Sequence, residues 1–180
     1  MKNLQHNSKQ SGAVLFVSLI LLLIMTLLGI TGMQTTILEE KMAGNSRNTN
    51  QAFQSAEAAL RRSEAWLSTQ ATEPAATSTG TNDIWTLSAM DPDTSNSDEW
   101  WEELNSSWWS SNGVSYGTTL SGINTPPLTI IEYKTFKSDT LLTGTGSIPT
   151  GLTFYQVTAK GTGGSDQAKV LLQSITARRY

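Results

Sequence analysis

The side chains that could do chemistry are concentrated in one acidic, tryptophan-rich block. Residues 91–110 read DPDTSNSDEWWEELNSSWWS and hold four of the six tryptophans and six of the fifteen acids of the chain. Carboxylates can bind a cation or act as general acids and bases. Hydrolysis by two carboxylates requires that they face each other across a substrate, whereas the adjacent Glu102 and Glu103 diverge on a helix. The block therefore does not indicate a hydrolase.

Cysteine and histidine, which supply many catalytic nucleophiles, bases and metal ligands, are almost absent. The 180 residues include no cysteine and one histidine, His6. His6 lies in the short hydrophilic segment at the N-terminus, and a chain that has lost this segment cannot form a Ser-His-Asp triad, a Cys-His dyad, a disulfide or a metal centre with thiolate or imidazole ligands. A net charge of −3 gives no basic field to attract nucleic acid. The composition predicts a protein that is not an enzyme, carries no cofactor and does not bind nucleic acid.

A calcium loop is one interpretation of the acidic block. Asp91, Asp93, Ser95 and Glu102 imitate positions 1, 3, 5 and 12 of an EF-hand loop. The sharp turn of that loop needs a glycine at position 6, where this chain has Asn96. The pattern is therefore a weak calcium candidate, and the sequence predicts no other metal site.

Two further interpretations concern the tryptophans. In the first, Ser97 caps a short helix whose aromatic side chains supply apolar area to a core. In the second, the aromatic side chains stay at the surface and bind a protein partner or a glycan. The candidates for partner binding are Trp100, Trp101, Trp108 and Trp109. The sequence leaves both interpretations open.

The block lies within a segment whose other patterns predict strands. Residues 128–136, 153–161 and 168–178 have the alternation or the composition of strands, and residues 84–87 suggest a short one. Residues 161–166 have turn chemistry that would join the last two strands into a hairpin. We expect residues 71–180 to form a globular head with an antiparallel sheet of about four strands.

A long apolar segment precedes the head. Residues 13–33 read AVLFVSLILLLIMTLLGITGM, and no charge occurs between Lys9 and Glu39. About 20 such residues in a helix span the hydrocarbon core of a bilayer. Lys2 and Lys9 precede the segment, so the positive-inside rule places the N-terminus in the cytoplasm and the head outside. The sequence predicts a single-pass anchor.

Helical periodicity continues beyond this anchor. An apolar face formed by Phe53, Ala56, Leu60, Ser63 and Leu67 follows the period of an amphipathic helix. We therefore expect one N-terminal helix over residues 13–70, with residues 13–33 in the membrane and residues 34–70 amphipathic. Packing of the helix on the sheet of the head would give an α+β fold.

The border before the helix resembles that of a type IV prepilin. A hydrophilic leader, residues 1–12, ends in Gly12 directly before the apolar helix begins at Ala13. The resemblance implies that prepilin peptidase cuts between these two residues, removing His6, and that Ala13 becomes N-methylated. Pilins usually carry Glu at the fifth mature position, where this chain has Val17. The alternative is an uncleaved signal anchor, which needs no carboxylate there.

The segment after the anchor narrows the family. Residues 36–60 read TILEEKMAGNSRNTNQAFQSAEAAL and resemble the N-terminal region of PilX-type minor pilins. Members of that group also tend to lack the Glu, which in major pilins is thought to pair with the amino terminus of a neighbouring subunit. A subunit at the pilus tip has no neighbour ahead, so Val17 favours a tip position.

The resemblance implies a function in assembly. It implies a pilin-like fold, a complex with other minor pilins and the major pilin that primes pilus assembly, and a PilY-type adhesin at the tip. It further implies roles in twitching motility and adhesion. The protein would lie in the bacterial inner membrane before assembly and in the pilus at the cell surface afterwards. Two alternatives are a minor pseudopilin of a type II secretion system and a membrane-anchored, Trp-rich protein that binds glycan or a partner.

Overall fold

The computed structural model describes residues 12–115, 120–139 and 150–180. The predicted leader therefore lies outside the described residues except for Gly12. The chain divides into two compact units, Met1–Gly44 and Asn45–Tyr180. The long helix α1 (Ala13–Thr69) belongs to both units, which we describe separately.

In the first unit the described chain is the apolar part of α1. Its large apolar side chains are all exposed, from 41% for Ile20 to 76% for Leu15. The hydroxyls of Ser18 and Thr26 donate to carbonyls three residues earlier, so these polar groups are satisfied without water. The helix is long and apolar enough to cross a membrane. In the absence of a core of its own, this surface needs lipid or other helices to cover it.

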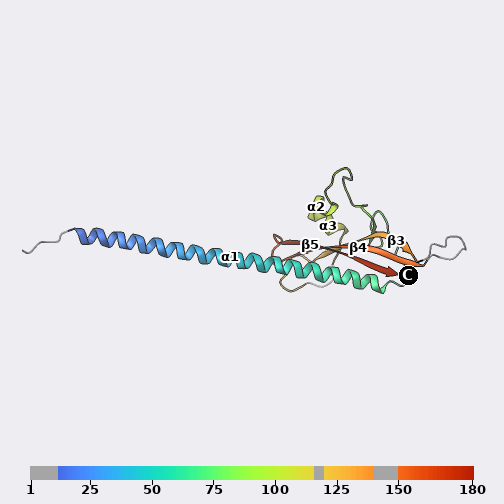
Figure 1. Ribbon diagram of the computed structural model, residues 1–180, viewed down its shortest axis with the longest axis horizontal. Coiled ribbons are helices and arrows are strands. Elements are labelled where there is room, and N and C mark those ends of the chain that lie inside the picture. Colours follow the sequence, from blue (N-terminus) through green and yellow to red (C-terminus); the bar gives the residue numbers. More distant parts are fainter. Residues whose placement is uncertain (1–11, 116–119, 140–149) are drawn as a thin grey trace, which may run out of the picture. The chain divides into compact units, whose positions relative to one another are not determined.

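The second unit contains a five-stranded sheet (Figure 1). Its strands are β1 (Ile84–Thr86), β2 (Val114–Ser115), β3 (Leu128–Ser138), β4 (Gly151–Thr162) and β5 (Lys169–Arg179). The strand order is β1-β3-β4-β5, and β3, β4 and β5 form an antiparallel meander. The predicted α+β, pilin-like fold is confirmed.

One strand pairing differs from the predicted antiparallel sheet. Strand β1 runs parallel to β3, with Ile84 opposite Ile131. The short β2, which the sequence did not suggest, is antiparallel to the start of the same edge of β3, with Val114 opposite Thr129. The edge of β3 is therefore shared between two short strands that run in opposite directions, which gives a mixed sheet.

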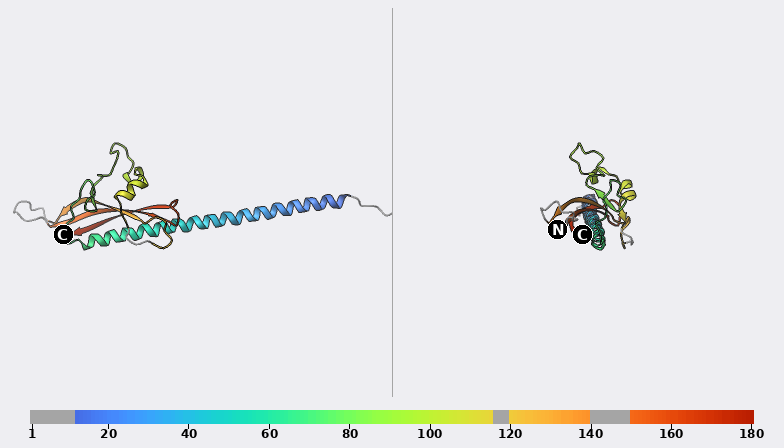
Figure 2. Two further views of the ribbon diagram at one scale, coloured as in Figure 1. Left: turned by 180° about the vertical axis from the view of Figure 1, so that it is seen from behind. Right: turned by 90° about the vertical axis from the view of Figure 1, so that its right-hand side faces the viewer.

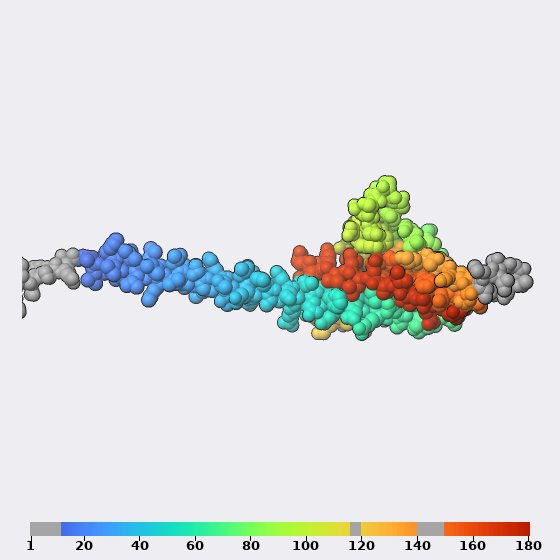
Figure 3. Space-filling model, viewed as in Figure 1, coloured from blue at the N-terminus to red at the C-terminus, as the bar shows by residue number. Residues whose placement is uncertain are grey.

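Helices cover both faces of this sheet. The part of α1 that belongs to the second unit lies along one face, and α2 (Trp100–Glu103) and α3 (Ser106–Asn112) lie on the other (Figure 2). Figure 3 shows α2 and α3, in yellow-green, on the side of the sheet opposite to the teal part of α1. Because neighbouring side chains of a strand point to opposite faces, Ile131 packs toward α1 while Ile130 packs toward α2 and α3.

The buried face of α1 is made of small side chains. It consists of Ala52, Ser55, Ala56, Ala59, Ser63 and Leu67. The prediction that Phe53 belongs to this face is wrong, because its side chain is 46% exposed. Strand β4 explains the difference, since a Cβ built on Gly161 would lie 2.3 Å from the carbonyl oxygen of Ala52. At such a close approach of helix and strand, only small side chains fit.

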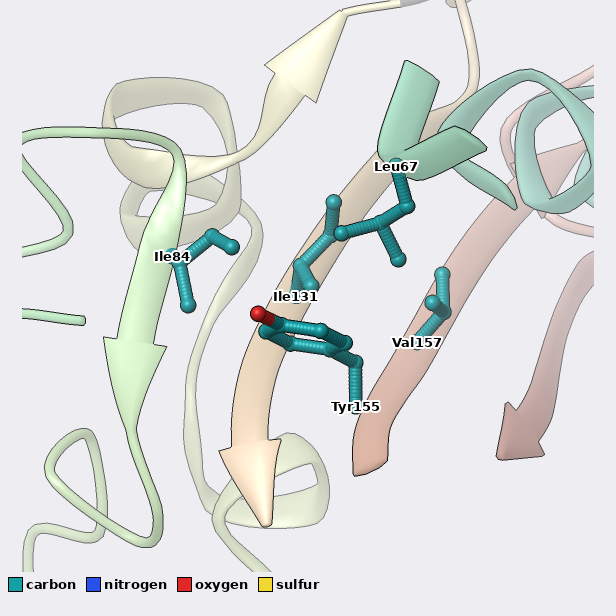
Figure 4. Packing of buried hydrophobic residues seen from close by; sticks show 5 residues of the cluster. All are labelled: Leu67, Ile84, Ile131, Tyr155 and Val157. Atoms are coloured by element: carbon teal, nitrogen blue, oxygen red, sulfur yellow. The ribbon is translucent and has the colours of Figure 1, made fainter. Parts of the chain in front are cut away.

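The core of the head lies where four elements meet. Leu67 of α1, Ile84 of β1, Ile131 of β3, and Tyr155 and Val157 of β4 are all buried there (Figure 4). Beside this cluster, the hydroxyls of Ser63 and Thr129 share a buried hydrogen bond of 2.7 Å. Apolar burial and satisfied polar contacts, which include a buried bond of 2.9 Å from the hydroxyl of Ser55 to the carbonyl of Thr162, thus hold α1 on the sheet.

Candidate functional site

The predicted processing site lies at the start of α1. The helix begins at Ala13, and the backbone of Gly12 has a φ of 104°, in the region that favours glycine. The carbonyl of Gly12 accepts a hydrogen bond of 3.4 Å from the N–H of Phe16, which closes the first helical turn. The first residue of the regular helix therefore lies directly after the predicted scissile bond between Gly12 and Ala13. Cleavage and methylation of Ala13 remain predictions.

The position of the missing carboxylate lies one turn further along. The side chain of Val17 is 55% exposed. It lines a shallow apolar groove on the surface of α1 together with Val14, Ser18 and Leu21. An apolar neighbour can cover this groove without leaving a charge unpaired.

The tryptophans of the acidic block form a cluster of tilted and edge-to-face rings on the second face of the sheet. Trp100 and Trp109 are only 3% and 1% exposed, and their ring centroids are 5.4 Å apart. Trp101 and Trp108 are half-buried and pack at the edge of the cluster. Trp85 of β1 completes it, with its ring 5.8 Å from that of Trp108.

Burial separates the four predicted partner-binding residues into two pairs. In this structure Trp100 and Trp109 act as core, so a partner could touch only Trp101 and Trp108 directly. Trp85 was absent from the predicted set because it lies in a short strand before the block, and no sequence pattern indicates that the two pack together. Partner binding at the exposed pair stays a prediction.

A buried carboxylate anchors the cluster to the sheet. Glu132 of β3 is 1% exposed. Its Oε1 accepts a hydrogen bond of 3.1 Å from the backbone N–H of Ser88, and its Oε2 accepts one of 3.3 Å from Nε1–H of Trp100. Burial raises the pKa of Glu132 above its usual value, and the two hydrogen bonds oppose this only in part. Sequence reasoning missed this residue, although an acid inside an apolar strand was the available signal.

The acidic residues of the calcium candidate bind their own loop. Asp91 accepts a hydrogen bond of 3.1 Å from the N–H of Asp93, and Asp93 accepts one of 3.0 Å from the N–H of Ser95. The hydrogen bonds from Ser95 lower the pKa of Asp93. Within residues 12–115, 120–139 and 150–180, no three Asp, Glu, His or Cys side chains lie close enough together to hold a metal ion. Glu102, the last residue of the calcium candidate, is therefore not part of such a group.

The expected cap of the short helix is also different. Helix α2 follows Glu99 without a side-chain capping bond, so the predicted role of Ser97 as its cap is wrong. Instead, Asn105 caps α3 by accepting a hydrogen bond of 2.9 Å from the N–H of Trp108. The block therefore folds as two short helices, and the break between them turns Trp100 and Trp109 toward each other.

Comparison with family models decides the assignment. The model described as PilX N-terminal matches residues 11–61, and the model described as Type IV pilus assembly protein PilX C-term matches residues 41–178. The chain belongs to the PilX family. No match was found among curated proteins or among solved structures. The predicted resemblance of residues 36–60 is confirmed, and the second match extends the family through the middle of the head.

Family membership gives the protein its general role. A PilX-type chain is a minor pilin of the type IV pilus, a structural pilus component rather than a member of a known enzyme family. Its apolar N-terminal helix fits a membrane anchor. Membership implies interaction with other pilus components and favours the type IV pilus over the predicted alternative of a type II secretion system.

Proposed function

We propose that this minor pilin helps to prime type IV pilus assembly as part of the tip complex. It enters the inner membrane once, with the N-terminus in the cytoplasm. Prepilin peptidase then cuts between Gly12 and Ala13, and Ala13 is methylated. The other minor pilins, the major pilin and a PilY-type adhesin are its partners, and through them the protein supports twitching motility and adhesion.

The observation that carries the proposal is the uncovered apolar surface of α1. From Ala13 to Leu38 the helix has no charged side chain, and its large apolar residues are exposed. Lipid can cover this surface before assembly, and the helices of neighbouring subunits can cover it in the pilus. Hydrophobic burial contributes little when a helix moves from lipid to helices, so close packing must supply the attraction. A shallow groove beside Gly29 and Gly32 permits such an approach.

The tip position rests on Val17. In a pilin with Glu at this position, the carboxylate needs a cationic partner, because an unpaired charge among apolar helices is strongly unfavourable. The groove around Val17 is apolar and requires no such partner. A subunit that has no neighbour ahead therefore loses nothing by lacking the carboxylate.

Deletion and a processing variant test the proposal in the native bacterium. We expect loss of the gene to remove most surface pili and twitching while the membrane stays intact. Gly12→Val should reproduce this phenotype, because the precursor keeps its leader. Gly44→Ala, at a helical position with no atom within 4 Å of the new Cβ, is the matched control and should assemble normally. Normal piliation of the deletion strain would contradict the priming role.

A further inference from the structure

A small notch opens on the face of the head that carries α3. It has a volume of about 210 Å³ and lies where the start of α3 meets the ends of three strand segments. Its main lining residues are Ser106, Trp109, Leu128, Lys160, Asp166 and Lys169. This volume is below the ~300 Å³ at which sites for drug-sized molecules begin, so the notch suits a single functional group.

Two lysines line this notch. Lys160 of β4 is opposite Leu171 of β5, and Lys169 lies two residues before Leu171. The two lysines are therefore diagonal neighbours on one face of the sheet. Nζ of Lys160 lies 5.2 Å from the ring centroid of Trp109 and 3.4 Å from Oγ of Ser106, so the aromatic ring and a hydroxyl hold it in place.

The positive charge of the notch is only partly neutralised within the described part of the head. Neither Lys160 nor Lys169 forms an ion pair with any residue that the structure describes. Asp166 lines the same notch and offsets one of the two positive charges, while its two oxygens accept hydrogen bonds from Thr125 at 2.7 Å and Asn124 at 2.8 Å. One positive charge therefore remains in excess in the notch. Burial, and secondarily the charge of Lys169, lower the pKa of Lys160. An anion between the two lysines would relieve both effects.

We propose that this notch binds one carboxylate, the side chain of an Asp or Glu from another pilus subunit packed against the head. The inference rests on the proposed function, which places other subunits around this chain. The acidic block of residues 91–103 is carried by the same layer as α3 and repels a long polyanion, whereas one carboxylate at the lysines meets little of that repulsion.

A zero-length crosslinker tests the contact in the native pilus. Carbodiimide joins an amine to a carboxylate only when the two are in contact. We expect mass spectrometry of treated pili to find Lys160 or Lys169 of the full chain joined to an Asp or Glu of a different pilus subunit. Crosslinks from these lysines only within the chain, or only to a second copy of it, would overturn the proposal.

Charge reversal provides the second arm. Lys169 is exposed and forms no ion pair with any residue that the structure describes, so Lys169→Glu should fold as the wild type does. We expect this variant to reduce co-purification of the other pilus subunits with the full chain about tenfold or more. The reason is that the introduced carboxylate repels the carboxylate of the Asp or Glu on the partner subunit. Lys137→Glu is the matched control, an exposed lysine on β3 with the same change of charge, and should co-purify normally.

The outcomes separate the two proposals. If Lys169→Glu and Lys137→Glu both co-purify the other subunits as the wild type does, the notch is not the contact, while the proposed function stands. If the wild-type chain co-purifies no pilus subunit at all, the proposed function fails and the notch proposal fails with it. Near-ultraviolet circular dichroism of the tryptophan cluster checks that each variant is folded.

Discussion

Trp100 and Glu132 join the helical layer of the head to its central strand. The indole Nε1–H donates a hydrogen bond of 3.3 Å to a carboxylate that is almost completely buried. The same carboxylate holds the chain after β1 through the N–H of Ser88. One ionisable group thus fixes two segments that local sequence alone would leave unconnected.

This arrangement predicts how stability depends on pH. Because burial raises the pKa of Glu132 in the folded state, that state binds more protons than the unfolded chain between the two pKa values. Stability from this residue is therefore present below the unfolded pKa and is lost as the pH rises through the folded one. We expect Glu132→Gln to remove this loss. Its free energy of unfolding minus that of the wild type should therefore increase from pH 4 to pH 8, which means that the variant gains stability relative to the wild type.

Denaturant titration of the full chain in detergent, followed by tryptophan fluorescence, measures this difference. Glu102→Gln replaces an exposed carboxylate on the same layer and is the control for the loss of one acidic side chain. A difference for Glu132→Gln that falls with rising pH would show that the carboxylate is better stabilised when ionised, contrary to our account.

A second prediction concerns the contact between α1 and β4. A methyl group on Gly161 would meet the carbonyl of Ala52 and the N–H of Ala56, which are backbone atoms that cannot rotate away. We expect Gly161→Ala to lower the free energy of unfolding by about 1–3 kcal/mol. Gly44→Ala has open space and should be neutral or stabilising by up to roughly 1 kcal/mol. Equal stability of the two variants would contradict the close packing.

The loss of stability on replacing a tryptophan by alanine should depend on how deeply its ring is buried. Trp109→Ala empties a fully buried site and should cost about 3–5 kcal/mol of unfolding free energy. Trp101→Ala removes a half-buried ring and should cost clearly less, while leaving the near-ultraviolet dichroism of the cluster largely intact. Thermal unfolding of both variants measures this, and an effect of Trp101 as large as that of Trp109 would be inconsistent with the described cluster.

Val17 gives a prediction in the assembled pilus. At the tip, a carboxylate at this position has no amino terminus ahead to pair with, and an unpaired charge among apolar helices is unfavourable. We expect Val17→Glu to reduce the amount of this protein in sheared pili several-fold relative to the membrane fraction. Val17→Leu should behave as the wild type does. Undiminished incorporation of Val17→Glu would argue against a tip position.

Local pattern explains which parts of the fold could be predicted. The uncharged run before Glu39 and the alternation of β4 are properties of neighbouring residues, so α1 and the antiparallel meander were accessible from sequence. The parallel pairing of β1 with β3 was not, because three residues carry no information about a partner more than forty positions away. Packing likewise overrode hydrophobicity at Phe53, where the approach of Gly161 selected small side chains instead.

The site shows the same limit. The resemblance in residues 36–60 identified the family, yet nothing in the tryptophan block distinguished buried from exposed rings. That distinction depends on Glu132 and Ile130, which reach the block from a strand about thirty residues further on. The notch between Lys160 and Lys169 was equally hidden, since the turn between β4 and β5 and the start of α3 are both needed to form it.

The mass of the N-terminal peptide from native pili tests the central claim most directly. If this chain is a processed subunit of the pilus, that peptide begins at Ala13 and carries one added methyl group. A peptide that begins at Met1, found in the membrane and absent from the pili, would contradict the account and leave the helix as a simple tether.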